Sequence, residues 1–181
     1  HWRQECLLPV AERITDAMLH GTDTGSSGAF AAAAYETKTA ADSFTGSYAD
    51  AVTEAAAWEK KQFSQVKPDT IFYLTNEILE QASVYIYDTG TTSGIYSEEK
   101  LHSRNPYDFF LSGPVALMRI ENPAAETDRK LIAFRDSYGS SLLPLLVPFY
   151  REILVADIRY TMSGRLGEFV DFASYRGADA L

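Results

Sequence analysis

The chain has 181 residues, of which 46% are hydrophobic and 23% charged, so it can form one packed domain and is not wholly disordered. Its 16 lysines and arginines against 25 aspartates and glutamates give a formal net charge of −9, which disfavours generic binding to nucleic acids or anionic membranes. No apolar run approaches the roughly 18 residues of a membrane helix, and the single cysteine, Cys6, excludes an intrachain disulfide and a cysteine-based zinc site.

The first predicted element is a helix over residues 3–20. Apolar residues recur at helical spacing from Cys6 to Met18, and Gly21 is a natural C-terminal stop. Because proline is tolerated only in the first turn of a helix, Pro9 indicates that the helix begins later than residue 3.

The middle of the chain carries loop and strand signals. Residues 21–34 are rich in Gly, Ser, Thr and Ala and indicate a loop, and residues 51–61 predict a short helix. Aromatic and β-branched residues predict strands over 71–75 and 83–87, the second followed by a turn at 88–90.

The C-terminal third predicts a right-handed βαβ unit. Two apolar strands over 130–135 and 152–157 flank a tight turn at 136–139 and a short apolar helix over 140–150. Near-continuous apolar character in both strands is typical of a parallel sheet covered on both faces. One more amphipathic helix is expected from Leu166 to Ala173.

Together these elements predict one α/β domain over the whole chain. Its core would comprise residues 1–21 and 116–181, and a β-rich insertion would occupy about 22–115. The chain starts at His1 without Met and ends without a polar tail, so we expect a piece truncated at both ends, with residues 178–181 leading into a further core strand. Any signal peptide or membrane anchor would then lie upstream of this chain and not be seen in it.

Ser137 stands where α/β proteins keep reactive groups, between the end of a strand and the start of a helix. A sharp turn there exposes the hydroxyl, and the backbone N–H groups of Ser137 and Gly139 can stabilise an oxyanion. Gly139 also lets the backbone approach a ligand closely. The alternative is that Asp136 and Ser137 only cap the helix, and the pattern alone leaves both open.

A serine nucleophile needs a base, and the chain has three histidines. His20 ends the first predicted helix and His102 lies in a polar loop, which favours structural and surface roles. Composition says nothing special about His1. No histidine and carboxylate pair has metal-ligand spacing, and no P-loop lysine is present, so neither a metal nor another cofactor is predicted.

Four short runs carry a resemblance to a known family. They resemble the bacterial DHHW proteins, which have an SGNH-hydrolase-like fold similar to the alginate O-acetyltransferase domains. The resemblance covers most of the chain in the same order and is best between Asn122 and Tyr160. The runs are His1–Trp2, Tyr107–Gly113, Arg135–Ser141 and Val155–Tyr160.

The resemblance implies roles for individual residues. Ser137 matches the nucleophile, and His1 matches the general base of an Asp-x-His-Trp motif whose Asp would precede this chain. Tyr138 follows the nucleophile and would pack over the site or fill core. Arg159 would bind an anionic sugar or carboxylate, or simply pair with Asp157.

Two departures weaken the match to SGNH enzymes. Arg135 stands where these enzymes carry glycine before Asp-Ser, and their Gly and Asn oxyanion donors have no counterpart that we can assign.

The resemblance therefore implies a three-layer SGNH-like protein with one of two functions. The first is a serine esterase or O-acetyltransferase acting on a cell-surface or exported polysaccharide, located outside the cytoplasm beside a membrane O-acyltransferase. The second, favoured by the departures, is a catalytically inactive module that binds a glycan or scaffolds an acetylation system.

Overall fold

The computed structural model describes residues 2–20, 34–44, 68–103, 105–161, 164 and 166–181. The predicted helix over 51–61 and, apart from Ala34, the predicted loop over 21–34 lie outside the described residues.

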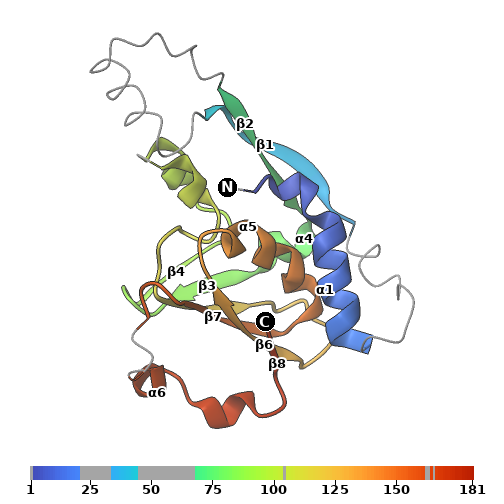
Figure 1. Ribbon diagram of the computed structural model, residues 1–181, viewed down its shortest axis with the longest axis vertical. Coiled ribbons are helices and arrows are strands. Elements are labelled where there is room, and N and C mark those ends of the chain that lie inside the picture. The colour runs from blue at the N-terminus through green and yellow to red at the C-terminus, as the bar shows by residue number, and fades with distance from the viewer. Residues whose placement is uncertain (1, 21–33, 45–67, 104, 162–163, 165) are drawn as a thin grey trace, which may run out of the picture.

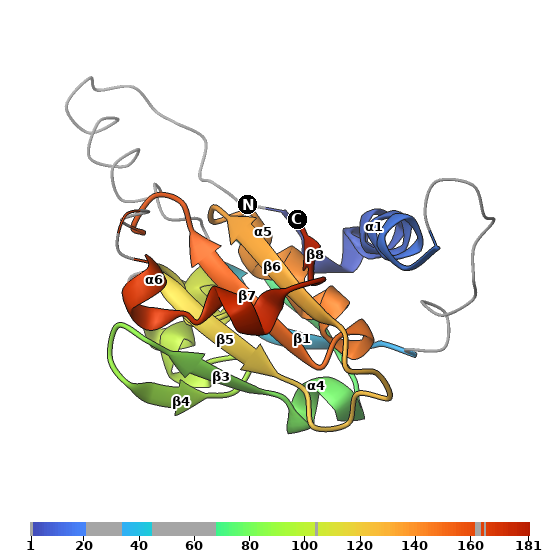
Figure 2. The same cartoon turned by 90° about the horizontal axis from the view of Figure 1, so that it is seen from below.

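A mixed six-stranded sheet forms the centre of the molecule (Figure 2). Its strands, in spatial order, are β4 (Thr91–Ser93), β3 (Ser83–Ile86), β5 (Leu117–Glu121), β7 (Glu152–Asp157), β6 (Lys130–Arg135) and β8 (Asp179–Ala180). The predicted bounds of β6 and β7 and their parallel pairing are confirmed, and β8 also runs parallel to β6.

The sheet is mixed, whereas the sequence predicted a parallel sheet. Strand β5 runs antiparallel to both β3 and β7, and β3 runs antiparallel to β4. The connection from β5 to β6 spans only residues 122–129, and a parallel crossover needs about a dozen residues or more. A connection this short returns the chain from the same end of the sheet, so β5 and β6 point in opposite directions.

Helices cover both faces of this sheet (Figure 2). One face carries α1 (Leu8–His20), α4 (Glu77–Gln81), α5 (Gly139–Leu142) and the 3-10 helix η4 (Leu143–Phe149). The other carries α6 (Leu166–Phe169) and the 3-10 helix η6 (Phe172–Tyr175). Alternate residues of β7 serve the two sides, because successive side chains of a strand point in opposite directions.

Prolines explain where the helices depart from prediction. The N-terminal helix begins at Leu8, with Pro9 in its first turn, after the short 3-10 helix η1 (Gln4–Cys6). The single helix expected over 140–150 is instead α5 followed by η4, because Pro144 and Pro148 lack the N–H groups that an α-helix needs.

A two-stranded antiparallel ribbon, β1 (Glu36–Phe44) and β2 (Asp69–Thr75), lies outside the central sheet (Figure 1). The 3-10 helices η2 (Glu98–His102) and η3 (Pro106–Phe109) follow β4, and η3 supplies aromatic rings that pack against the ribbon. The division into core and insertion stays a prediction, although β3 and β4 of the expected insertion pair within the central sheet.

Candidate functional site

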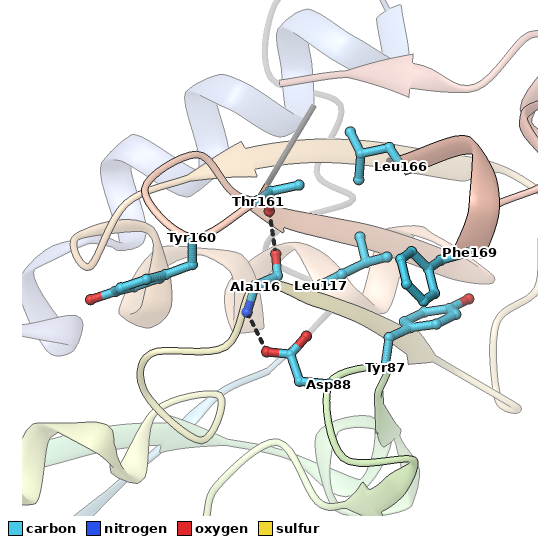
Figure 3. Close-up of a pocket in the computed structure, with 8 residues that line it drawn as sticks. All are labelled: Tyr87, Asp88, Ala116, Leu117, Tyr160, Thr161, Leu166 and Phe169. Carbon is cyan, nitrogen blue, oxygen red and sulfur yellow. Dashed lines mark hydrogen bonds between the residues drawn. The ribbon is translucent and has the colours of Figure 1, made fainter. Parts of the chain in front are cut away.

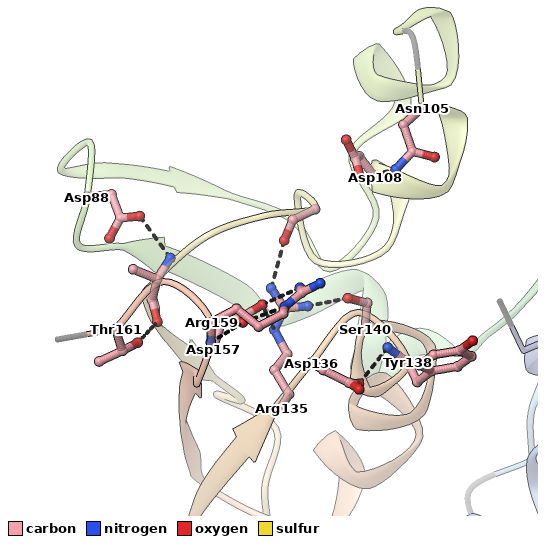
Figure 4. A network of polar contacts seen from close by, with 12 residues as sticks. Asp88, Asn105, Asp108, Arg135, Asp136, Tyr138, Ser140, Asp157, Arg159 and Thr161 are labelled. Atoms are coloured by element: carbon pink, nitrogen blue, oxygen red, sulfur yellow. Dashed lines mark hydrogen bonds and ion pairs between the residues drawn. The ribbon is translucent and has the colours of Figure 1, made fainter. Parts of the chain in front are cut away.

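The site lies at the edge of the sheet where the parallel strands β6 and β7 end (Figure 4). Asp157, the last residue of β7, is fully buried, and Arg159 binds it through both ends of its guanidinium. Arg159 Nε lies 2.9 Å from Asp157 Oδ1, Nη2 lies 2.7 Å from Oδ2, and the Arg159 backbone N–H also donates to Oδ1. Burial would raise the pKa of Asp157, but the hydrogen bonds and charge of Arg159 outweigh it and hold this pKa below its usual value.

Arg135, the last residue of β6, ties three segments together from beneath this pair. Its Nη2 donates to the Gly113 carbonyl at 2.7 Å, Nη1 donates to Ser140 Oγ, and Nε lies 4.0 Å from Asp157 Oδ2. Burial lowers the pKa of the Arg135 guanidinium, and the charge of Asp157 opposes this effect. The arginine that departs from the SGNH pattern therefore binds both the turn at Gly113 and the start of α5.

Two glycines are required by close packing around Arg135. A Cβ at Gly139 would lie 2.7 Å from the Arg135 Cβ, so the absence of a side chain here makes room for the arginine. Gly113 has φ +73°, and a Cβ on it would lie 2.6 Å from the Asp108 Cβ. Asp108 accepts a hydrogen bond from the Asn105 side chain at 2.7 Å, and burial raises its pKa.

The turn that carries Ser137 is held by its neighbours. Asp136 Oδ1 accepts a hydrogen bond from the Tyr138 backbone N–H at 2.8 Å, which braces the turn before α5. The N-cap residue of α5 is Tyr138, and no side chain caps this helix. Ser137 itself is half-buried, and its side chain makes no hydrogen bond within the part of the chain that the structure describes. Tyr138 is 43% exposed, which places its ring at the surface beside the turn.

The N-terminal segment docks against this same turn. The Trp2 ring lies 5.1 Å from the Tyr138 ring, and the Tyr107 hydroxyl donates to the Trp2 carbonyl at 2.9 Å. Burial raises the pKa of Tyr107 to about 12, so its hydroxyl stays a donor at neutral pH. His1, the predicted base, lies outside the described residues.

Gln4 fixes the docked segment from inside the protein. Its side chain is completely buried, donates to the Ser141 carbonyl of α5 at 2.8 Å and accepts from the Leu74 N–H of β2 at 2.7 Å. One amide thus joins the N-terminal segment, the ribbon and the helix that follows Ser137.

The structure brings the four sequence runs together. Trp2 contacts both Tyr138 and Tyr107, while Arg135 links Gly113 to the Asp157–Arg159 pair. The exposed His102 ends η2 and takes no part in these contacts, and His20 is the last residue of α1. Sequence reasoning missed the bracing roles of Gln4 and Gly113. The Ser112-Gly113-Pro114 run could have indicated a strained turn. No pattern in the sequence indicates that the Gln4 side chain is buried.

Within the described ranges, no group of three or more His, Cys, Asp or Glu side chains is placed to hold a metal ion. No described helix combines the length and the apolar character needed to cross a bilayer.

Solved structures similar to this chain include three that match over 99% of it. A DHHW family protein from Eubacterium siraeum is 22% identical, with a TM-score of 0.63. Bacillus cereus PatB1 with a sulfonyl adduct is 12% identical with a TM-score of 0.64, and a second PatB1 structure is 15% identical with a TM-score of 0.61. No family model and no curated protein matches the sequence.

At these identities the likeness establishes a shared fold. The present chain spans 55%, 56% and 58% of the three matched chains, a little over half of each.

Proposed function

We propose that this chain is an SGNH-like domain of the DHHW type, and a serine esterase or O-acetyltransferase acting on a cell-surface or exported polysaccharide. The observation that carries the proposal is the contact of Trp2 with Tyr138. These residues are the sequence neighbours of His1 and Ser137, and their contact supports assigning the predicted base and the predicted nucleophile to one site.

In this proposal Ser137 attacks the acyl carbonyl and His1 accepts the hydroxyl proton. The backbone N–H groups of Ser137 and Gly139 stabilise the oxyanion of the tetrahedral intermediate. The intermediate collapses to an acyl-serine as His1 gives its proton to the departing group of the acyl donor. A polysaccharide hydroxyl or water then attacks the acyl-serine while His1 accepts its proton, and His1 returns that proton to the serine oxygen as the acyl group leaves. Arg159, held rigid by Asp157, binds the substrate beside the turn.

Two observations support this assignment beyond the Trp2 contact. The DHHW family protein and PatB1 share the fold, and PatB1 has been observed with a sulfonyl adduct. Sulfonyl groups react with activated nucleophiles such as a serine beside a base. An extracytoplasmic location and a membrane O-acyltransferase partner belong to the same proposal.

The test is acetyl-ester hydrolysis by a form of the protein that includes the residues preceding His1. We expect Ser137→Ala to lower kcat/KM for p-nitrophenyl acetate at least about 10³-fold, because the loss of a nucleophile removes the whole covalent route. A sulfonyl fluoride should label Ser137, as located by peptide mass spectrometry. The control, Ser174→Ala, alters an exposed serine of η6 and should leave the rate unchanged.

Unchanged hydrolysis and labelling in Ser137→Ala would show that Ser137 is not the nucleophile. The inactive glycan-binding module would then be the better assignment. It is favoured by Arg135, whose side chain is committed to structural contacts at the position of the SGNH glycine.

A further inference from the structure

A second concave site lies on the opposite face of the sheet from α5 (Figure 3). Its cavity of about 250 Å³ has a floor made by Ala116 and the buried Leu117. Figure 3 shows the Tyr87 and Phe169 rings at one end and the Tyr160 ring at the other. The volume lies below the range of about 300 to 1,000 Å³ that is usual for drug-sized ligands, so the cavity suits one small ring or group.

The polar groups of the cavity are few and fixed. Asp88 Oδ2 accepts from the Ala116 N–H at 2.9 Å, and Thr161 Oγ1 donates to the Ala116 carbonyl at 2.7 Å. These two bonds leave the second carboxylate oxygen of the exposed Asp88 at the rim. Asp88 is the only charged residue among the described residues that line the cavity, so anionic ligands are disfavoured.

Consecutive residues connect this cavity to the candidate active site. Asp157 and Arg159 belong to the network around Arg135, the Arg159 guanidinium lies 5.0 Å from the centre of the Tyr160 ring, and Thr161 lines the cavity. Figure 4 shows Asp88 and Thr161 on one side of the Asp157–Arg159 pair and Ser140 and Tyr138 on the other. An extended ligand that lies along Arg159 and Tyr160 would therefore contact both places.

We propose that this cavity, lined by Tyr87, Asp88, Tyr160, Thr161 and Phe169, binds an uncharged sugar ring of the polysaccharide whose hydroxyl is acylated or deacylated at Ser137. This inference rests on the proposed function and adds a subsite to it. A sugar ring offers apolar C–H faces to aromatic walls and hydroxyl donors to a carboxylate. An alkyl or acyl chain would desolvate the Asp88 carboxylate without giving it a donor, which costs free energy.

The experiment measures binding without catalysis. The isotope-labelled 181-residue chain is titrated with cello-, chito-, xylo- and manno-hexaose, and amide shifts are followed by NMR. We expect at least one oligosaccharide to shift the amides of Tyr87, Leu117 and Thr161. Phe169→Ala should weaken that binding about tenfold, since one aromatic wall is lost, and Asp88→Asn should weaken it several-fold.

Phe172→Ala is the matched control. Phe172 is 44% exposed, close to the 50% of Phe169, and lies in the same C-terminal segment without lining the cavity, so its loss should leave affinity unchanged. The subsite is wrong if no oligosaccharide shifts these amides, if Phe172→Ala weakens binding as much as Phe169→Ala, or if 1-hexanol shifts them more than every sugar.

The titration is repeated on Ser137→Ala and compared with the hydrolysis assay of the same variant. This comparison distinguishes failure of the sugar subsite from failure of the proposed function. Retained sugar binding in a protein whose ester hydrolysis never depended on Ser137 would keep the subsite and reject the enzyme. Ser137-dependent hydrolysis without sugar binding at the cavity would keep the enzyme and reject the subsite.

Discussion

The two faces of the central sheet are covered very unequally. Among the described residues, the face under α1 and η4 carries a core cluster of 23 buried residues, whereas the cluster under α6 and η6 has five. The sparsely covered face also leaves aromatic rings in solvent, among them Phe134, Phe169 and Phe172. Alternate side chains of β7 belong to the two clusters. The same strand therefore packs into the large core on one face and into the small cluster on the face that carries the cavity.

Truncating one leucine on each face gives the largest expected difference. Leu145 of η4 is completely buried, so Leu145→Ala should destabilise the protein by about 4 kcal/mol, through lost burial and the cavity left behind. Leu166 of α6 is only partly buried, so Leu166→Ala should cost about 1 kcal/mol. Urea unfolding followed by circular dichroism measures both, and equal losses would show that the faces contribute alike.

Two glycines with positive φ allow a second comparison, between a tightly packed position and an open one. Gly113→Ala forces a Cβ against Asp108 and should cost about 3 kcal/mol, from backbone strain plus overpacking. Gly177, which precedes β8, has φ +78° with nothing within 4 Å of an added Cβ, so Gly177→Ala should cost about 1 kcal/mol from strain alone. Thermal unfolding of the two variants tests this, and a Gly177→Ala cost equal to that of Gly113→Ala would refute the packing argument.

The smallest expected effect concerns the sheet edge between the two faces, and it depends on pH. Arg159→Leu leaves the Asp157 carboxylate buried, with Arg135 Nε 4.0 Å away, and should cost about 1 to 2 kcal/mol at pH 7. This is below the usual cost for a buried pair because the Arg159 side chain is 39% exposed and partly screened.

The sign of the pH effect follows from the depressed pKa of Asp157. The stability that this carboxylate contributes is present above its unfolded-state pKa of about 3.9 and is lost as pH falls through its lower folded-state pKa. The difference between wild type and Arg159→Leu should therefore shrink below about pH 4, as measured by urea unfolding from pH 7 to 3. A constant difference would mean that Asp157 is not the partner that matters, and Arg176→Leu, at an exposed arginine, controls for the loss of one positive charge.

The sequence predicted best the elements whose pattern is purely local. The apolar runs of β6 and β7 gave bounds that the structure confirms at both ends. Strand β5 was not predicted, because Arg119 interrupts its apolar run and its partners β3 and β7 are distant in the chain. Pairing direction depends on connection lengths between such distant elements, which composition and periodicity do not encode.

The candidate site was predictable as a set of motifs but not as a network. Ser137 and Tyr138 lie in a bend after the end of β6, as expected, and Gly139 is already the first residue of α5. The pairing of Arg159 with Asp157 is the simplest of the contacts considered for Arg159. In the sequence, Arg135 was only a departure from the glycine of the SGNH pattern. In the structure its buried side chain braces the turn through Gly113 and Ser140, and only the three-dimensional arrangement reveals these contacts.

The buried amide of Gln4 binds a partner that is synthesised much later than Gln4 itself. Its partner Ser141 lies 137 positions later in the sequence, and ribosomes add about 5 to 20 residues per second. During synthesis the segment around Gln4 therefore precedes by on the order of ten seconds the segment that receives it. During that interval Leu7 and Ala11, which belong to the main core of the folded protein, lack the later-made residues of η4 and β7 that complete this core.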